Sequence, residues 1–347
     1  IFREYDIRGV ADRDMLDSDV QDLGRALGTF LTRLGAKRMG LGRDCRLSSP
    51  RLHHALRAGL LETGLTLVDI GVGPTPMLYF AVFHLDLDGG VQITGSHNPP
   101  EDNGFKMMKG KQSLFGPDIQ TLRAMIQDRD FDLPGGGVVE ECDPLPAYTG
   151  FMRGNISLAR TNLRVAIDAG NGAGGPAARA ALRSVGLDPI ELLCEMDGAF
   201  PMHHPDPSQP ENLELLRRTV LEHGLDLGIA FDGDADRIGV IDARGDTIWG
   251  DKLMILFSRA ILARHPKAAI ISEVKCSQTM YADIAARGGR PIMWRTGHSL
   301  IKKKMKEEGA LLAGEMSGHM FFADRFFGFD DAIYASLRLL EIVAESD

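Results

Sequence analysis

Residues 163–185 read LRVAIDAGNGAGGPAARAALRSV and contain one complete structural unit. The apolar run Leu163–Ala169 predicts a buried strand, Asn171–Gly175 a glycine-rich turn, and Pro176–Val185 a helix with proline in its first turn. The same order of strand, polar loop and helix recurs at Met39–Thr63 and Ala269–Arg287. Strands alternating with helices are typical of α/β folds. We therefore predict three tandem, related α/β domains with mixed, mostly parallel sheets around a central cleft.

The domain boundaries follow from composition and length. The stretch Asp130–Pro146 is rich in glycine, proline and acidic residues, which favours a linker. At about 150 residues per domain, two or three domains are expected. We place the domains at residues 1–146, 147–246 and 247–347.

Composition excludes several classes of protein. The chain has 347 residues, 44% of them hydrophobic, and a net charge of −9, which argues against disorder and against a nucleic-acid partner. The best apolar candidate for a membrane span, Leu253–Ala263, is interrupted by Arg259 and is far shorter than the roughly 20 residues that cross a bilayer. Four scattered cysteines without a C-x-x-C pattern, and a start without a signal-peptide pattern, favour reduced thiols in the cytoplasm.

A loop that could carry a nucleophile follows the predicted strand Gly90–Thr94. It reads Thr94-Gly95-Ser96-His97-Asn98-Pro99-Pro100, so Ser96 falls at the carboxyl end of a strand, where α/β proteins bind ligands. An ordinary Asn-Pro turn is the alternative. A serine-hydrolase elbow is excluded, because its G-x-S-x-G pattern requires glycine where Thr94 and Asn98 stand.

Three carboxylates at alternating positions predict a metal site. The segment Phe231–Arg237 reads FDGDADR, which lets Asp232, Asp234 and Asp236 converge on one hard divalent cation. A solvated acidic turn is disfavoured, because the loop follows an apolar strand and three unpaired like charges are costly to pack. An EF-hand would need glycine and glutamate where Arg237 and Ala243 stand, so Mg²⁺ is favoured over Ca²⁺.

A third polar loop reads Gly314-Glu315-Met316-Ser317-Gly318-His319 and could bind vicinal hydroxyl groups. A plain turn is an equal alternative. We interpret His203-His204 as part of a proline-rich loop rather than a metal site, and the lysines of 302–306 as a solvated helix face. Four basic residues in loops or strands, each more typical of solvated surface when taken singly, complete the set: Arg8, Lys106, Lys275 and His298.

Taken together, the patterns T-G-S-H-N-P, D-G-D-x-D-R and G-E-x-S-G-H, in this order and spacing, resemble the α-D-phosphohexomutases. The nearest branch is the bacterial phosphomannomutase/phosphoglucomutase branch. The resemblance extends from Phe2–Gly9 to Gly328–Asp331, over essentially the whole chain. The chain departs from the family in two ways. Ala235 stands where many members have glycine, a change that should keep the turn. The family's fourth domain, whose Arg-Ser-Asn-type loop binds phosphate, is expected to be absent because the chain ends before it.

The resemblance implies a role for each matching residue. Ser96 would carry the phosphoryl group, and Arg237 would contact the phosphate or the substrate. Mg²⁺ would be bound by a phosphate oxygen on Ser96 and by Asp232, Asp234 and Asp236. The sugar hydroxyls would be read by Glu315, Ser317 and His319. The active-site cleft would be lined by Tyr5, Arg8, His97, Lys106, Lys275 and His298.

The balance of charge agrees with that assignment. Phosphoserine carries up to about −2, so with three aspartates and Mg²⁺ the cluster reaches about −3, which Arg8, Lys106 and Arg237 would offset. Phospho-Ser96 would phosphorylate the free hydroxyl of a hexose phosphate, form a hexose 1,6-bisphosphate as intermediate and activator, and recover the other phosphoryl group. The candidate general bases are Lys106 and His298.

Other hypotheses stay open. The chain could be a catalytically impaired sugar-phosphate-binding fragment, or a phosphatase or phosphotransferase with an aspartyl nucleophile in Asp232–Asp236. Mannose and glucose differ at one hydroxyl, worth about 1 kcal/mol per hydrogen bond, so the preference is undecided. We expect a monomer whose partners are hexose phosphates, with neither nucleic acid nor membrane among them.

Overall fold

The computed structural model describes residues 1–2 and 6–346. The chain forms two compact units: unit 1 comprises Ile1–Pro146 and Asp197–Ala199, and unit 2 comprises Ala147–Met196 and Phe200–Asp347. No helix among the described residues combines the length and apolar character needed to cross a membrane.

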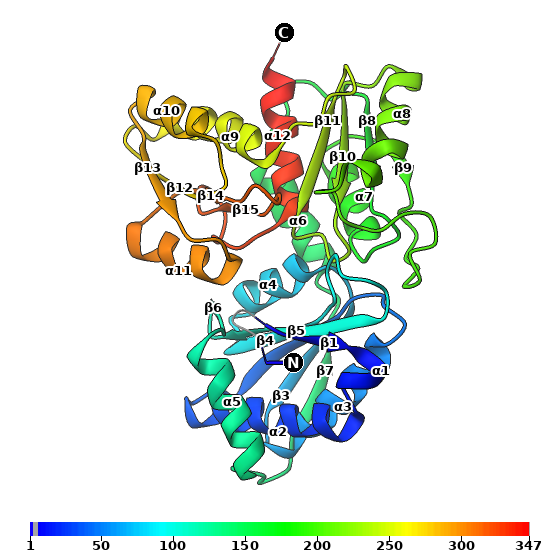
Figure 1. The fold of residues 1–347 in the computed structure, drawn as a ribbon, viewed down its shortest axis with the longest axis vertical. Helices are drawn as coiled ribbons and strands as arrows, with labels where there is room; N and C mark the ends of the chain where they lie inside the picture. The colour runs from blue at the N-terminus through cyan, green and yellow to red at the C-terminus, as the bar shows by residue number, and fades with distance from the viewer. Residues whose placement is uncertain (3–5, 347) are drawn as a thin grey trace. The chain divides into compact units, whose positions relative to one another are not determined.

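Unit 1 is built on a seven-stranded mixed sheet. Across the sheet the strands are β1 (Ile7–Val10), β5 (Asp102–Lys109), β4 (Gly89–Ile93), β2 (Arg38–Arg43), β3 (Thr66–Val72) and β7 (Val138–Glu141), with β6 (Gln112–Ser113) paired to β5. The run from β4 to β7 is parallel, whereas β5 is antiparallel to both of its neighbours β1 and β4. The helices are α1 (Ala11–Asp14), α2 (Asp17–Arg33), α3 (Ser49–Glu62), α4 (Thr75–His84) and α5 (Pro117–Asp128). Figure 1 shows α4 on one face of the sheet and α2, α3 and α5 on the other.

Part of the predicted linker is a strand. β7 lies within Asp130–Pro146 and pairs in parallel with β3, from Thr66 opposite Val138 to Asp69 opposite Glu141. All four residues of β7 are exposed, so the segment lacks the apolar alternation by which strands are recognised. An edge strand of this kind is held by backbone pairing rather than by a buried face.

Unit 2 contains two four-stranded sheets. The first is ordered β11 (Ile238–Asp242), β10 (Leu227–Phe231), β8 (Val165–Asp168) and β9 (Ile190–Leu192), and only β11 is antiparallel. The second is ordered β13 (Arg290–Trp294), β12 (Ala269–Glu273), β14 (Leu312–Gly314) and β15 (Met320–Phe322), and only β15 is antiparallel. The helices are α6 (Leu145–Asn155), whose first two residues belong to unit 1, α7 (Gly175–Ser184), α8 (Glu214–His223) after the 3₁₀ turn Pro210–Leu213, α9 (Gly250–Arg264), α10 (Gln278–Ala286), α11 (His298–Glu308) and α12 (Ala332–Glu345).

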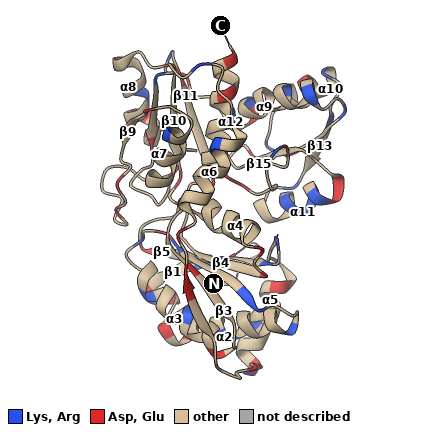
Figure 2. Ribbon diagram, turned by 180° about the vertical axis from the view of Figure 1, so that it is seen from behind, with Lys and Arg blue, Asp and Glu red and all other residues tan. Residues whose placement is uncertain are grey.

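The helix α12 joins the two sheets of unit 2. It packs against α7 and β11 of the first sheet and against α9 and β15 of the second, and its residues 332–341 are all buried (Figure 1). Its polar members are paired inside: Arg338 Nη2 donates to Asp324 Oδ2 at 2.7 Å. By contrast, outer helices such as α3, α5 and α11 carry both basic and acidic residues (Figure 2). The predicted α/β architecture with mixed, mostly parallel sheets is confirmed.

The close packing of α2 on α3 makes a first prediction. A Cβ added at Gly59 would lie 2.0 Å from the backbone oxygen of Gln21, far inside contact distance, so Gly59→Ala must push the helices apart. We expect a loss of about 2 kcal/mol in the free energy of unfolding, measured by urea denaturation. Gly150 of α6 has nothing within 4 Å of its added Cβ, so Gly150→Ala is the control and should be neutral or stabilising. Equal effects of the two substitutions would contradict the packing argument.

Candidate active site

The predicted nucleophile Ser96 lies in a tight turn directly after β4 of unit 1. Its backbone is left-handed, with φ of +50°, which residues with a side chain rarely adopt. The Ser96 N–H donates to Thr94 Oγ1 at 2.9 Å, and the Gly95 N–H donates to Asp44 Oδ2 at 3.1 Å. Ser96 Oγ lies 3.1 Å from Nδ1 of His97. The turn therefore holds the hydroxyl in a defined position beside an imidazole.

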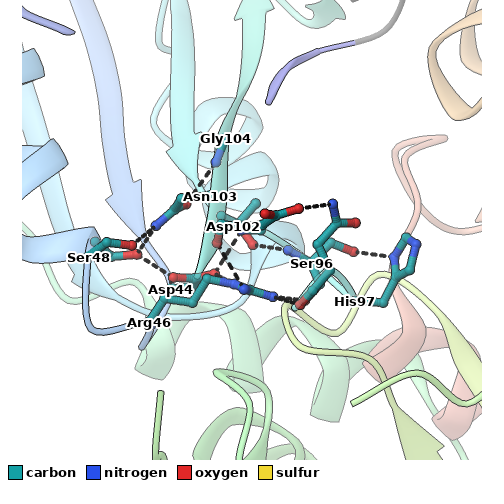
Figure 3. A network of polar contacts seen from close by, with 12 residues as sticks. Asp44, Arg46, Ser48, Ser96, His97, Asp102, Asn103 and Gly104 are labelled. Atoms are coloured by element: carbon teal, nitrogen blue, oxygen red, sulfur yellow. Dashed lines mark hydrogen bonds and ion pairs between the residues drawn. The ribbon is translucent and has the colours of Figure 1, made fainter. Parts of the chain in front are cut away.

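A buried guanidinium holds the backbone of this turn (Figure 3). Arg46 is 1% exposed, and its terminal nitrogens donate at 2.5–2.9 Å to four carbonyl oxygens, those of Ser96, Asn98, Pro99 and Asp102. Its Nε lies 3.2 Å from Asp44 Oδ2, so the buried charges are paired. A Cβ at Gly95 would lie 2.4 Å from the guanidinium carbon, so this close approach requires glycine.

Two basic candidates lie in the same unit. Arg8 Nη1 donates to Asn98 Oδ1 at 2.6 Å, and Nη2 lies 2.8 Å from Asp6 Oδ2, so Arg8 is held against the serine loop. Lys106 is buried on β5, the neighbour of β4 that leads into the loop. Tyr5 lies outside the described residues.

The three predicted metal ligands lie in the turn between β10 and β11 of unit 2. Asp232, Asp234 and Asp236 are fully buried, and one carboxylate oxygen of each lies within 4.8 Å of the others. Asp232 Oδ1 also accepts from the N–H groups of Asp236 at 3.0 Å and Arg237 at 3.1 Å. Ala235 adopts φ of +56°, so alanine takes up the left-handed conformation that glycine adopts most easily.

This set of donors fits a hard divalent cation. Mg²⁺ prefers carboxylate oxygens, and three buried carboxylates this close repel one another unless a cation compensates them. A second group of facing ligand atoms contains Asp236, His319 and Asp330. There, however, Lys302 Nζ lies 2.9 Å from Asp330 Oδ1 and already supplies a positive charge. The aspartate trio is therefore the better candidate for the metal.

The loop that holds the metal candidates is joined to the loop that carries Glu315, Ser317 and His319. The Ile238 N–H donates to the Gly318 carbonyl at 3.1 Å. Gly318 has φ of +96°, and a Cβ there would lie 2.3 Å from the Ile238 oxygen, so the approach requires glycine. Unit 2 thus brings the predicted metal ligands and the predicted sugar-binding loop together.

His319 lies between charges of both signs. Its Nδ1 lies 3.2 Å from Asp330 Oδ2 and 3.6 Å from Asp236 Oδ1, and its Nε2 accepts from Arg237 Nε at 2.9 Å. Burial alone lowers the pKa of His319, but the two carboxylates raise it above its ordinary value. Because Nε2 needs a lone pair to accept from Arg237, the neutral ring carries its proton on Nδ1, toward Asp330. A metal ion on Asp236 would weaken one of the influences that raise this pKa.

His298 and Lys302 complete this buried group. The His298 ring stacks on His319, with centroids 5.8 Å apart, and its Nδ1 lies 3.6 Å from Asp330 Oδ2. Burial raises the pKa of Asp330, yet Lys302 and the two imidazoles hold it well below its usual range. The prediction of a solvated lysine face is wrong for two of its members: Lys302 is 13% exposed and paired with Asp330, and Lys304 is 17% exposed and paired with Glu308. The neighbours of Lys302 in sequence are also lysines, and this hid its different environment.

The other predicted sugar-binding residues lie on loops after parallel strands. Glu315 Oε1 accepts from the Gly297 N–H at 2.7 Å, and Ser317 Oγ donates to Glu315 Oε2 at 3.4 Å. Lys275 is half exposed, and its Nζ lies 3.4 Å from Glu273 Oε1. These loops follow β12, β13 and β14, so one edge of the second sheet collects them.

Several residues of these networks were missed by the sequence analysis: Asp44, Arg46, Glu273, Lys302 and Asp330. A signal existed for three of them. Asp44 and Arg46 come directly after the buried strand β2, and Glu273 ends the buried strand β12. Charged residues at the carboxyl end of a buried strand are candidates for a site in any α/β protein. Asp330 and Lys302 carry no comparable local signal.

His203, interpreted from sequence as part of a proline-rich loop, is paired with a carboxylate. Its Nε2 lies 3.0 Å from Oδ2 of the buried Asp168 at the end of β8. The hydrogen bond to Asp168 raises the pKa of His203, and the negative charge of Asp168 raises it further, whereas burial lowers it. Histidine is therefore bound to a carboxylate here, and no metal group containing it is found among residues 1–2 and 6–346.

This pair predicts a pH-dependent contribution to stability. Because the folded pKa of His203 exceeds the unfolded value of about 6.5, the pair stabilises unit 2 fully below that value and loses its effect as the pH rises through the folded pKa. His203→Gln should therefore lower the free energy of unfolding more at pH 5.5 than at pH 9. Urea denaturation at both pH values measures this difference. The same loss at both would show that the pair contributes through packing alone.

The segments that form the three sheets each match a known family of protein domains. Residues 1–132, 146–245 and 249–347 match the family models for phosphoglucomutase/phosphomannomutase alpha/beta/alpha domains I, II and III, respectively. The chain is 48% identical over 345 residues to a phosphomannomutase/phosphoglucomutase of Pseudomonas aeruginosa, covering 99% of this chain and 74% of that protein. It is 46% identical over 348 residues to a phosphoglucomutase of Neisseria gonorrhoeae, covering 100% and 75%. A solved phosphoglucomutase/phosphomannomutase family structure from Burkholderia thailandensis superposes with a TM-score of 0.96 at 43% identity, covering 99% of this chain and 76% of that one.

The fold and its loops thus define the class: the chain belongs to the α-D-phosphohexomutases, a family of isomerases. Within that class it belongs to the phosphoglucomutase/phosphomannomutase family. The chain spans about three quarters of the length of these relatives.

Proposed function

We propose that the protein interconverts hexose 1-phosphates and hexose 6-phosphates of glucose and mannose, through phospho-Ser96 and a hexose 1,6-bisphosphate, with Mg²⁺. One observation carries the proposal: three buried aspartates share a backbone junction with the loop of Glu315, Ser317 and His319. Cation ligands and hydroxyl-binding side chains joined in this way suit a phosphorylated sugar. Four free cysteines, at positions 45, 142, 194 and 276, agree with a reducing cytoplasm.

The proposed chemistry is a phosphoryl transfer in two directions. The bond between Ser96 Oγ and phosphorus breaks while a bond forms from phosphorus to the free sugar hydroxyl, whose proton passes to a base. The bisphosphate then reverses its orientation, and its other phosphoryl group is transferred to Ser96. Mg²⁺ held by the aspartate trio would supply positive charge to the phosphoryl oxygens. We propose that Arg8 and Lys106, which lie close to the serine loop in unit 1, add positive charge on the same group.

The base is proposed from the same geometry. Lys106 is buried on the strand beside the serine loop, and His298 faces the buried Asp330. His298 is favoured in unit 2, because a carboxylate beside Nδ1 would stabilise the imidazolium formed when Nε2 takes the proton. In this proposal the sugar is held by Lys275, Glu315, Ser317 and His319. Arg237 contacts the phosphate.

The aspartyl-nucleophile alternative gains nothing from the geometry. Asp232 Oδ1 accepts two backbone N–H groups, which suits a residue that shapes the loop rather than one that attacks phosphorus. The test is to treat the enzyme with glucose 1,6-bisphosphate and map the phosphopeptides. Phosphate on Ser96 supports the proposal, and phosphate on the Asp232–Asp236 segment would overturn it. A coupled assay with both hexose 1-phosphates then determines the sugar preference.

Removing one carboxylate of the metal site should raise the stability of the metal-free protein and lower its affinity for Mg²⁺. Asp234→Asn keeps the shape of the side chain and removes one of three buried like charges. We expect the metal-free variant to be more stable by roughly 1 kcal/mol, and its affinity for Mg²⁺ to fall at least about tenfold. Thermal unfolding with and without MgCl₂ measures both. Asp246→Asn is the matched control, because its side chain is 70% exposed. An unchanged Mg²⁺-dependent shift in Asp234→Asn would remove this residue from the metal site.

A further inference from the structure

Glu273 stands out among the buried acidic residues because the mechanism above does not use it. It is fully buried at the carboxyl end of β12, which lies between β13 and β14 in the second sheet of unit 2 (Figure 1). The three parallel strands end at the same edge, and the loops that follow them lead to the predicted site residues Lys275, His298 and Glu315. A side chain at the end of the middle strand can therefore reach all three loops.

The carboxylate of Glu273 contacts each of these loops. Its Oε1 accepts from the Met316 N–H at 2.9 Å, in the loop after β14, and lies 3.4 Å from Lys275 Nζ, in the loop after β12. Its Oε2 accepts from the hydroxyl of Thr296, in the loop after β13. All three partners are donors, which matches an ionised carboxylate that can only accept. The Lys275 ammonium compensates the buried charge.

The partners of Glu273 are adjacent in sequence to the side chains proposed to hold the sugar. Met316 lies between Glu315 and Ser317. The loop of Thr296 continues into Gly297, whose N–H donates to Glu315 Oε1 at 2.7 Å. Glu315 joins the two loops because it belongs to one and accepts from the other. Glu273 bridges the same two loops from outside them and also holds Lys275. Fixing these loops fixes the spacing of the groups that face the sugar.

We infer that Glu273 is the positioning residue of the sugar site: its carboxylate sets the relative positions of Lys275, the Thr296 loop and the Glu315–Ser317 loop for the hydroxyls and phosphate of a hexose phosphate. The inference rests on the proposed function. Glu273 acts through its neighbours and takes no part in phosphoryl transfer.

The experiment compares variants of the contact between Glu273 and Thr296. We expect Glu273→Gln to raise KM for glucose 1-phosphate roughly tenfold, because its amide cannot accept from all three donors, with kcat changing much less. Thr296→Val should raise KM in the same direction, whereas Thr296→Ser keeps the hydroxyl and should restore the wild-type value. The double variant Glu273→Gln with Thr296→Val should be no worse than Glu273→Gln alone, since Thr296→Val removes only a contact that Glu273→Gln already disrupts.

The control is Glu341→Gln. Glu341 is also a buried carboxylate that accepts from a backbone N–H, that of Ser157 at 3.1 Å, but it lies on α12. The inference is overturned if Glu273→Gln stays folded with an unchanged KM, or if Glu341→Gln raises KM equally. Hydrogen exchange of the Met316 amide separately tests the hydrogen bond from this amide to Glu273: exchange should accelerate in Glu273→Gln. A wild-type chain without mutase activity would defeat the proposed function, while the exchange result would still decide the role of Glu273 in ordering the loops.

Discussion

Ser96→Ala should abolish isomerisation of glucose 1-phosphate and mannose 1-phosphate, lowering kcat by at least about 10⁴-fold. The reason is chemical. In the proposed reaction Ser96 Oγ is the atom that carries phosphorus between the two sugar positions, and alanine has no atom that can replace it. The left-handed turn and the hydrogen bond from Arg46 involve only backbone atoms of Ser96, so the loop should persist in the variant. A coupled assay of product formation measures the loss.

Two further variants make the result specific. Ser96→Thr keeps a hydroxyl, but a β-branched side chain is disfavoured at φ of +50°, so an intermediate loss of roughly 10²-fold is expected. Ser113→Ala, on the short strand β6 of the same unit, should leave kcat unchanged. Turnover that persists in Ser96→Ala would favour the aspartyl nucleophile in Asp232–Asp236.

The sequence predicted those parts of the fold and site whose signal is local. An apolar run followed by glycines and a helix, as in 163–185, is sufficient to predict a strand, a turn and a helix, because each element depends on its own residues. The three polar loops were found for the same reason: the residues of each loop are contiguous. Their resemblance to one family then suggested roles that no single loop could have indicated.

What the sequence could not predict depends on contacts between distant segments. Arg46 follows β2, yet its partners are carbonyls 50 to 56 residues further along the chain. Lys302 lies within a run of lysines, and its ion pair with Asp330, 28 residues away, distinguishes it from the exposed Lys303. The exposed strand β7 has no apolar pattern and is held by pairing with β3. Hydrogen bonds of this kind leave no periodic signal in composition.

The second large effect is expected at Arg46, which has no role in the proposed chemistry. Its side chain is fully buried and faces Asp44, and it donates to three carbonyl oxygens of the serine loop and to that of Asp102 at the start of β5. Arg46→Met leaves Asp44 as an unpaired buried charge, so we expect unit 1 to lose about 3–5 kcal/mol of stability. Arg46→Lys keeps the charge, but an ammonium cannot reproduce the planar fork, so it should recover only part of this loss. Urea denaturation of each variant measures the difference.

The cause of this loss can be separated from a general intolerance of substitution. If the unpaired charge dominates, adding Asp44→Asn to Arg46→Met should restore part of the stability, because both charges are then gone. Arg33→Lys is the matched control: Arg33 also pairs with carboxylates, those of Asp130 and Asp132, but is 41% exposed, so its substitution should change the stability far less than Arg46→Lys. Arg46→Lys should also lower kcat by about 10²-fold even where it remains folded, since the Ser96 carbonyl loses its donor and the hydroxyl shifts with it. A folded Arg46→Lys variant with wild-type kcat would show that the turn holds Ser96 without the guanidinium.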